Sequence, residues 1–277
     1  MLIGISGKIG SGKDTVGSII QYLIDCNETP DMNVDFKFWY SSSLYSKYNQ
    51  LNPSWQIKKY AFKLKQIVAL ITGCSVDDLE SQEFKARGLG EEWAKNQSWS
   101  HIPENEKNIE NQDAIIYTRN IPTYRWLLQK IGTEAMRDTI HNNIWINALF
   151  ADYKSTLDGY QIHTKYKELG GHGVFIGNET SYQKEYEKNV QELMKEFMNS
   201  NMPNWIITDM RFPNELKAVE DRDGITIRVQ RGVETNEGHE SETALDFAKF
   251  SYVIDNNGTI EELVKKVKEI LILEKII

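Results

Sequence analysis

The feature that most constrains the fold is a glycine-rich stretch close to the start of the chain. Residues 7–13 read Gly-Lys-Ile-Gly-Ser-Gly-Lys, which matches the pattern G-x-x-x-x-G-K. A short apolar run, Leu2–Ser6, comes directly before it, and apolar residues at helical spacing follow over Lys13–Ile24. Glycines let backbone N–H groups converge on a phosphate, and a helix N-terminus adds unpaired donors and partial positive charge. A glycine turn that only starts a helix is the alternative, but this order of elements favours a phosphate-binding loop (P-loop).

Lys13 is predicted to reach the β- and γ-phosphates of a nucleotide. The residue after this lysine departs from the general motif, in which Ser or Thr offers a hydroxyl to Mg²⁺. Here Asp14 follows, with Thr15 one place later, so either residue is a candidate magnesium ligand. The predicted nucleotide-binding residues are Gly10, Ser11, Gly12, Lys13, Asp14 and Thr15.

Short apolar runs alternate with amphipathic segments along the chain. This alternation predicts a doubly wound α/β fold, a parallel sheet flanked by helices. We expect one P-loop domain over 1–277, with inserted segments over 25–54, 85–118 and 154–201 that serve as lid or substrate-binding elements. The expected strands are 2–6, 56–62, 114–118, 205–208, 225–229 and 252–254, and the expected helices are 13–24, 63–72, 76–84, 124–138, 143–153, 183–199, 213–220 and 260–273.

A second apolar run ends in charged residues. Trp205–Thr208 reads as a buried strand, and Asp209 and Arg211 follow it. In open α/β sheets ligands bind outside the carboxyl ends of the strands, so both side chains would share an edge with the P-loop if this strand is parallel to the first. The carboxylate could hold Mg²⁺ or a substrate hydroxyl, and the guanidinium could grip a phosphate. An ion pair at the strand end is the less favoured alternative.

The predicted middle helix carries two further polar features. Arg125 and Gln129 lie four residues apart and therefore on one helical face, where they could meet a phosphate and a base. Gly132 and Thr133 interrupt the helix propensity where a backbone could approach a ligand. Each of these residues has an ordinary solvated or capping explanation as well, and Trp145 is more often a core residue than a stacking platform.

Composition excludes several other classes of protein. The formal net charge of −8 argues against sequence-independent nucleic-acid binding, which requires a basic face. No apolar run approaches the ~18 residues of a spanning helix, and no secretory leader is evident, so we expect no membrane partner and a cytoplasmic protein. Two cysteines, Cys26 and Cys74, are read as reduced thiols.

Four blocks of the sequence together resemble the deoxynucleoside monophosphate kinases of large tailed bacteriophages. The GKDT form of the P-loop is itself typical of that family. The resemblance leaves most of the three inserted segments unexplained. The blocks are ISGKIGSGKDT (5–15), RWLLQKIGTE followed by Trp145 (125–145), IITDMRFPNE (206–215), and HESE leading to VIDNNGTIEELVKKV (239–267).

This resemblance implies an adenylate-kinase-like fold, ATP and Mg²⁺ as cofactors, a deoxynucleoside monophosphate (dNMP) acceptor, the cytoplasm of a host cell and a homodimer. It gives the catalytic roles to Lys13, Arg125 and Arg211. His239, Glu240 and Glu242 of the fourth block could form a metal-binding cluster, but their spacing suits no common zinc site, so we prefer a structural role for them. Arg119, Arg125 and Arg137 are candidates for a clamp on the transferred phosphate. The residues placed around the monophosphate are Arg125, Gln129, Gly132, Thr133, Trp145, Asp209 and Arg211. Lys65 and Lys85 are further candidates, for which an ordinary solvated lysine is an equally good explanation.

The predicted reaction is in-line transfer of the γ-phosphoryl group of ATP to a dNMP phosphate, giving dNDP and ADP. That acceptor is already largely ionised, so positioning and positive charge suffice. Another small-molecule P-loop kinase is the nearest alternative, but Ala61-Phe62-Lys63 offers no base for a nucleoside hydroxyl. A nucleotide-dependent switch is the second alternative, because residues 221–224 fit D-x-x-G, although the same residues read as an ordinary glycine turn.

Overall fold

The computed structural model describes residues 1–50, 53–101, 115–171, 181–232 and 243–277. This part of the chain forms two compact units, residues 1–60 with 146–277 and residues 61–145. The first unit holds the parallel sheet and the P-loop, and the second is mainly helical. The single domain expected over 1–277 stays a prediction.

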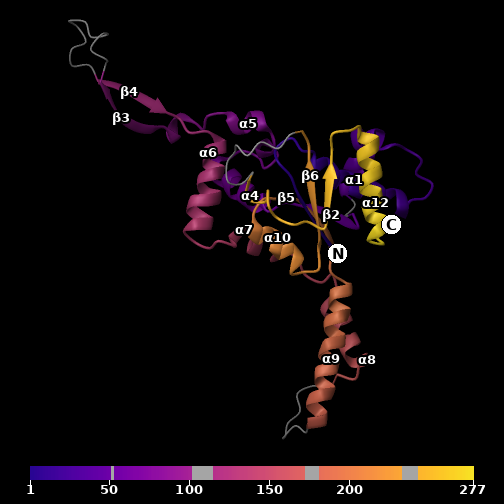
Figure 1. Ribbon diagram of the computed structural model, residues 1–277. Coiled ribbons are helices and arrows are strands. Elements are labelled where there is room, and N and C mark those ends of the chain that lie inside the picture. The colour runs from indigo at the N-terminus through magenta and orange to yellow at the C-terminus, as the bar shows by residue number, and fades with distance from the viewer. Residues whose placement is uncertain (51–52, 102–114, 172–180, 233–242) are drawn as a thin grey trace, which may run out of the picture. The chain divides into compact units, whose positions relative to one another are not determined.

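A five-stranded parallel sheet forms the centre of the first unit (Figure 1). The strand order is β2-β5-β1-β6-β7, so the strand that precedes the P-loop lies in the middle. The ladders on both sides of it are parallel, which confirms the predicted α/β fold. The strands are β1 (Leu2–Ser6), β2 (Trp55–Lys58), β5 (Asn204–Met210), β6 (Ile225–Gln230) and β7 (Tyr252–Asp255).

Helices cover both faces of this sheet, as expected of a doubly wound fold. Ile3 of β1 lies in one core cluster with apolar residues of α1 (Lys13–Glu28) and α12 (Ile260–Leu273), so these two helices share a face. Side chains alternate along a strand, and the next residue, Gly4, faces α10 (Pro213–Glu220) instead. Figure 1 shows α1 and α12 side by side, with α10 away from them.

Residues 25–54, expected to form an inserted segment, contain two short helices, α2 (Phe36–Ser41) and α3 (Ser43–Gln50). Trp39 is fully buried in the main core, and its indole N–H donates to Asp25 Oδ2 at 2.7 Å. The sequence does not reveal these helices, because helices of six and eight residues are too short to show a clear period of 3.6.

The second unit packs its helices around a small core of its own, which contains Val68 and Leu127. The single helix expected over 76–84 is instead two short turns, because the Ser81 side chain caps a new helix there. A strand over 95–101, which the sequence does not suggest, pairs antiparallel with the expected one. The elements are α4 (Ala61–Thr72), η1 (Asp78–Glu80), α5 (Gln82–Ala86), η2 (Glu91–Trp93), β3 (Lys95–His101), β4 (Ile115–Asn120) and α6 (Tyr124–Gln129).

The helix expected over 124–138 changes its hydrogen bonding halfway. It begins as α6, where the side chain of Thr123 accepts the N–H of Trp126 at 3.1 Å, and continues as a π-helix over Lys130–Asp138. A π-helix in the middle of an α-helical pattern is rare and often marks a functional position. α7 (Ile144–Phe150) follows, shorter than the predicted 143–153.

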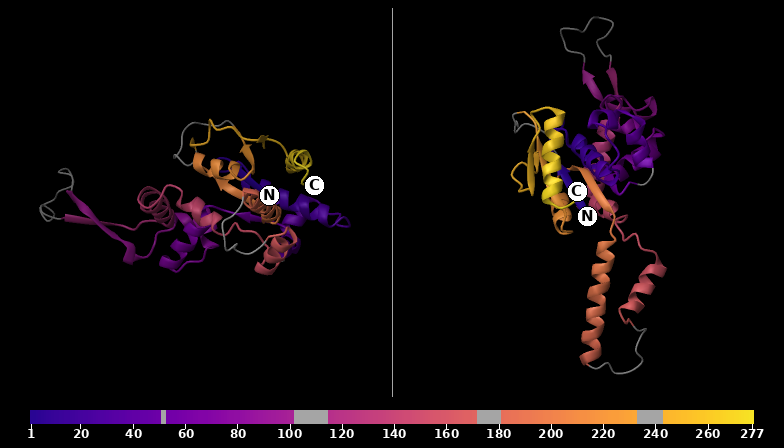
Figure 2. Two further views of the ribbon diagram at one scale, coloured as in Figure 1. Left: turned by 90° about the horizontal axis from the view of Figure 1, so that it is seen from below. Right: turned by 90° about the vertical axis from the view of Figure 1, so that its right-hand side faces the viewer.

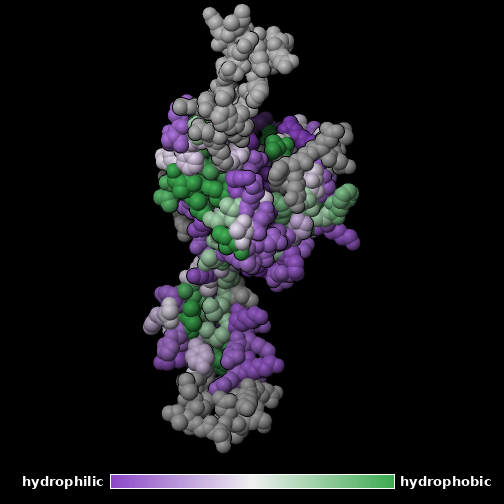
Figure 3. Space-filling model, turned by 90° about the vertical axis from the view of Figure 1, so that its left-hand side faces the viewer, coloured by the Kyte–Doolittle hydropathy of each residue, from purple (hydrophilic) through white to green (hydrophobic). Residues whose placement is uncertain are grey.

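The inserted segment 154–201 forms a helical pair, α8 (Gly159–Glu168) and α9 (Ser181–Ser200), which Figure 2 shows side by side. Its two ends meet, because the backbone N–H and the hydroxyl of Thr156 donate to the Asn201 carbonyl at 2.9 and 3.0 Å. Apolar residues lie along one side of this pair of helices (Figure 3). A groove of about 440 Å³ there is lined by Tyr166, Gln191, Met194, Lys195, Met198 and Met202.

Two further expectations can be compared with the structure. Cys26 and Cys74 are both free thiols, as predicted. Among the described residues, no helix combines the length and the apolar character that crossing a membrane requires.

Candidate functional site

The P-loop folds as a closed turn between β1 and α1. The N–H of Ser11 donates to the Lys8 carbonyl at 3.1 Å, and Gly12 caps α1 with a φ of 92°. The Lys13 side chain lies against the protein, with the residue 9% exposed. The buried hydroxyl of Ser11 has no hydrogen-bond partner among the described residues. An unmatched buried hydroxyl beside a helix N-terminus fits a loop that takes an anion such as phosphate.

A residue from the far end of the chain supports the loop from outside. The side-chain amide of Asn256, which directly follows β7, donates from Nδ2 to the Ser11 carbonyl at 2.8 Å. A Cβ at position 12 would lie 2.4 Å from that nitrogen, and the φ of Gly12 is in the left-handed region. Both reasons require glycine at this position.

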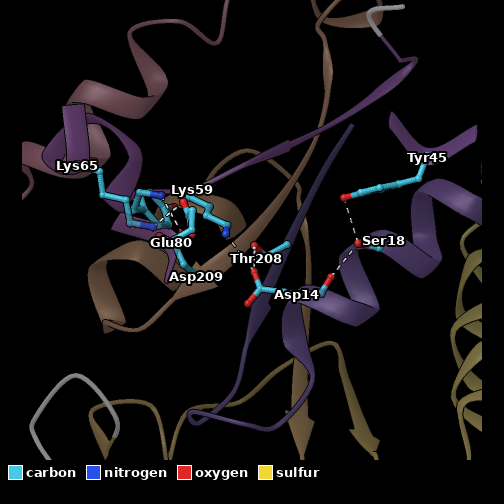
Figure 4. Close-up of polar contacts among 9 residues, drawn as sticks. Asp14, Ser18, Tyr45, Lys59, Lys65, Glu80, Thr208 and Asp209 are labelled. Carbon is cyan, nitrogen blue, oxygen red and sulfur yellow. Dashed lines mark hydrogen bonds and ion pairs between the residues drawn. The ribbon is translucent and has the colours of Figure 1, made fainter. Parts of the chain in front are cut away.

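Asp14 links the first turn of α1 to the neighbouring strand (Figure 4). Its Oδ1 accepts a hydrogen bond from the Thr208 hydroxyl at 2.9 Å and lies 3.5 Å from the Lys59 ammonium. Thr208 belongs to β5, and Lys59 directly follows β2. The carboxylate is still 62% exposed. Asp14 is therefore anchored through one oxygen and presents the other to solvent.

The oxygen atoms at this end of α1 are suited to magnesium. Mg²⁺ prefers oxygen ligands, and it is usually held by one or two protein groups together with substrate phosphates. Asp14 and Thr15 offer a carboxylate and a hydroxyl in the first turn of the helix. In the parts of the chain that the structure describes, no cluster of three or more metal-binding side chains occurs. The donor set fits an ion that is bound mainly through a nucleotide.

Asp209 and Arg211 lie at the carboxyl end of β5, on the sheet edge that also carries the P-loop, because β5 and β1 are parallel. Asp209 Oδ1 accepts the backbone N–H of Tyr60 at 2.8 Å. The N–H of Arg211 donates to Glu215, a buried carboxylate in α10, at 2.7 Å. Burial, and then the negative charges of Glu215 and Asp209, raise the pKa of Tyr60 far above its usual value.

A buried ion-pair network supports the start of the P-loop. Asp246 lies 2.7 Å from Arg228 Nη2 and 3.3 Å from the ammonium of Lys8. Arg228 also donates to the Ser6 hydroxyl at 3.1 Å. These contacts tie the end of β1 to β6 and to the segment after residue 242.

The other predicted site residues belong to the second unit. Arg125 Nη2 donates to the Gln82 side chain at 3.0 Å, so its guanidinium braces the start of α5. The ammonium of Lys65 is largely buried and lies 2.6 Å from Glu80. Gln129 is exposed at the end of α6.

Gly132 and Trp145 contact each other directly within that unit. The buried indole N–H of Trp145 donates to the Gly132 carbonyl in the π-helix at 2.8 Å. A Cβ at position 132 would lie 2.8 Å from Leu64 Cδ2, so the glycine lets α4 approach closely. Thr133 is half-buried in the same π-helix, and Lys85 is half-buried on α5. These observations give Trp145 and Gly132 a packing role, and their predicted substrate roles stay predictions.

Some candidates fall outside this description. His239, Glu240, Glu242 and the side chain of Arg119 lie outside the described residues. Arg137 is half-buried in the π-helix. Residues 221–224 form the turn between α10 and the amino end of β6, which is the edge of the sheet opposite the P-loop. The D-x-x-G pattern therefore has its ordinary explanation as a turn.

Sequence reasoning missed three residues of this site. Lys59 and Asn256 each follow the carboxyl end of a strand, so applying the strand-end rule to β2 and β7 would have found them. Thr208 lies inside a buried strand, where nothing in the sequence distinguishes it from a core threonine.

A strand, a glycine-rich loop with a buried lysine and a helix, all at the carboxyl edge of a parallel sheet, define a protein of the P-loop kinase class. Within that class, residues 180–267 match the model of the deoxynucleotide monophosphate kinase family. The match agrees with the predicted kinase family and with its activity, the phosphorylation of deoxynucleotide monophosphates, and says nothing of a phage origin. It covers α9, β5, α10, β6, β7 and the first part of α12, and it does not include the P-loop. No curated protein matches the chain significantly.

Proposed function

We propose that the chain transfers the γ-phosphoryl group of ATP in line to the phosphate of a dNMP, with Mg²⁺ as the accompanying ion. The contact between Thr208 and Asp14 carries this proposal. It joins β5, in the segment that matches the kinase family, to the first turn of the P-loop helix. The family segment and the P-loop therefore contribute to one site.

The loop and Lys13 hold the donor phosphates in this proposal. Backbone N–H groups around Gly10, Ser11 and Gly12 converge on the phosphate chain, and Lys13 lowers the cost of the charge that develops during transfer. When bound, Mg²⁺ neutralises and orients phosphate oxygens. Asp14 and Thr15 are the residues that would hold it.

The acceptor needs no general base. A phosphate monoester has a second pKa of about 6, so it carries its nucleophilic oxygen ionised at neutral pH. Asp209 and Arg211 would orient it at the rim. The remaining proposed acceptor residues belong to the second unit: Lys65, Lys85, Arg125, Gln129, Gly132, Thr133 and Trp145.

The residues after β2 disfavour a kinase that acts on a hydroxyl. Such an acceptor needs a carboxylate base, and Lys59 and Tyr60 stand there instead.

The decisive experiment measures ADP release from Mg-ATP with each common dNMP and rNMP in turn. We expect release that depends on one or more dNMPs. Lys13→Ala should lower kcat/KM by about 100-fold or more, the loss typical of removing one preorganised charge-stabilising group. Lys217→Ala is the matched control, because this lysine of α10 is exposed and forms an ion pair with the nearby Asp221 at 2.6 Å.

Near-normal turnover in Lys13→Ala would overturn the mechanism. ATP hydrolysis that no monophosphate stimulates would overturn the acceptor and favour a nucleotide-dependent switch. The homodimer implied by the resemblance is also proposed here, and light scattering after size exclusion should give twice the chain mass of 32.1 kDa.

A further inference from the structure

We propose that Asn256 is a positioning residue that sets the direction of a phosphate-binding N–H group in the P-loop. The inference rests on the proposed function, since it concerns how the loop receives a nucleotide phosphate. Its basis is the 2.8 Å hydrogen bond from Asn256 Nδ2 to the Ser11 carbonyl, across 245 residues of sequence.

Because of the geometry of the peptide bond, this contact also fixes the direction of the N–H group of Gly12. In a trans peptide the C=O and the N–H point in opposite directions, and the structure contains no cis bond in its described part. The Ser11 carbonyl points outward to Asn256, so the N–H of Gly12 points the other way, into the turn of the loop. This peptide joins two of the residues that the motif assigns to phosphate.

Asn256 is itself held in place from two sides. Its backbone N–H donates to the Gln230 carbonyl at 2.8 Å, at the end of β6. The carbonyl of the preceding residue, Asp255, accepts from the Lys266 ammonium of α12 at 2.6 Å. Because Asn256 is itself held in place, it can keep the peptide between Ser11 and Gly12 in one orientation before a nucleotide binds. This lowers the entropic cost of ordering the loop on binding.

The contact also explains the space around Gly12. The amide of Asn256 occupies the volume that any side chain at position 12 would need. The contact made by Asn256 therefore requires that position 12 remain a glycine.

The neighbouring residue offers a matched control. Asn257 Oδ1 accepts the N–H of Gly232 at 2.7 Å, and its side-chain amide donates to Asp255 Oδ1. Within the described residues, neither of these contacts involves the P-loop. Replacing Asn257 disturbs the same turn without touching the Ser11 carbonyl.

The experiment titrates ADP and ATP into the full-length protein and its variants and measures Kd. Asn256→Ala should raise both Kd values by about 3- to 10-fold, the equivalent of one net hydrogen bond. Asn256→Asp should raise them by more than about 10-fold, because a carboxylate would face the Ser11 carbonyl. Asn257→Ala and Asn257→Asp should stay within about twofold of wild type, which also controls for the added charge.

Two readouts separate positioning from a merely structural role. In steady state, Asn256→Ala should raise KM for ATP and leave KM for the dNMP unchanged. The melting temperature without nucleotide should fall no further than in Asn257→Ala. Should Asn256→Ala fold poorly, Asn256→Ser, whose shorter side chain does not reach the carbonyl, must show the same rise in Kd.

Normal Kd values in both Asn256 variants, with wild-type binding intact, overturn this inference and leave the proposed function standing. Equal losses of nucleotide affinity in the Asn256 and Asn257 variants overturn it as well. If wild type binds neither ADP nor ATP, the proposed function fails, and this inference fails with it.

Discussion

Asp14 replaces the hydroxyl residue that usually follows the P-loop lysine, and its contacts show how the site accommodates a carboxylate there. The Thr208 hydroxyl and the Lys59 ammonium both approach the same oxygen, which offsets its negative charge and fixes its direction. The other oxygen stays available on the exposed side. The substitution therefore depends on Thr208 of β5 and on Lys59, which directly follows β2.

Thr208→Val should remove the hydrogen bond that fixes the direction of the Asp14 carboxylate, with little change in side-chain volume. We expect kcat/KM to fall by about 10-fold and the free energy of unfolding to fall by about 1 kcal/mol, the net value of one hydrogen bond. Thr226→Val is the control, because Thr226 of β6 is also almost fully buried and its hydroxyl hydrogen-bonds with the Ser251 hydroxyl at 3.2 Å. An equal loss of activity in both variants would show that Thr208 acts only through stability.

Tyr60 gives a prediction for alkaline pH. Its hydroxyl is buried and donates to the Glu215 carbonyl at 3.2 Å, and its raised pKa keeps it protonated in the folded state. Above about pH 10 the unfolded chain ionises this tyrosine while the folded protein does not, so wild-type stability should fall by up to about 1.4 kcal/mol per pH unit from this residue alone.

Tyr60→Phe should be less stable than wild type by about 1 kcal/mol at pH 7, and that deficit should shrink as pH rises beyond 10. Chemical denaturation at several pH values measures both effects. Tyr160→Phe is the control, since Tyr160 lies in the first turn of α8 and is 79% exposed. A deficit in Tyr60→Phe that does not change with pH would contradict the argument.

The candidate site residues that can be predicted from the sequence are those whose role follows from residues next to them in the chain. The P-loop reads directly from seven consecutive residues, and Asp209 and Arg211 read from the end of one strand. Lys59, Thr208 and Asn256 contact Asp14 or the P-loop only because the sheet brings distant strand ends together, and one sequence does not display that adjacency.

Among the elements, those with strong caps or a long apolar period were predicted best. Pro213–Glu220 and Ile260–Leu273 agree to the residue with α10 and α12, because a proline opens the first and a capping box opens the second. The short helices of residues 25–54 and the change to π-helical bonding leave no periodic signal. Tertiary contacts determine where these elements form.

The close approach of α1 to β5 depends on a glycine inside the helix. A Cβ at Gly17 would lie 2.6 Å from the methyl group of Thr208, the residue that bonds Asp14. Gly17→Ala should therefore lower the free energy of unfolding by about 1–3 kcal/mol, despite the better helix propensity of alanine. It should also reduce kcat/KM, because the helix must move away from the strand.

Gly159→Ala serves as the control for that change. Nothing lies within 4 Å of the position of its Cβ at the start of α8, so its effect should stay within about 0.5 kcal/mol. Denaturant titration compares the two variants. A neutral Gly17→Ala would mean that α1 adjusts without cost and that the contact does not set the site.

For the whole molecule, the inserted helical pair should be separable from the sheet. Thr156 and Asn201 are already hydrogen-bonded to each other, so a short Gly-Ser linker in place of residues 158–199 spans the ends without strain. We expect the shortened protein to fold and to bind ADP within about threefold of the wild-type Kd. An ADP-induced rise in melting temperature measures this.

Loss of ADP binding in a shortened protein that still folds would show that the pair supports the nucleotide site. Unchanged turnover of dNMPs would exclude the role of lid or acceptor site that the sequence suggests for residues 154–201.

The central position of β1 has a consequence for how the protein forms during synthesis. β1 is made well before its partners β5 (Asn204–Met210) and β6 (Ile225–Gln230), and the brace from Asn256 is made later still. Pairing across such separations is slow, because the free-energy cost of closing the loop comes before the contacts form. This apolar strand therefore waits without its neighbours until residues 204–230 have been made. Nucleotide binding by a nascent chain should accordingly appear abruptly, only after residue 256 has left the ribosome, although the binding motif is made much earlier.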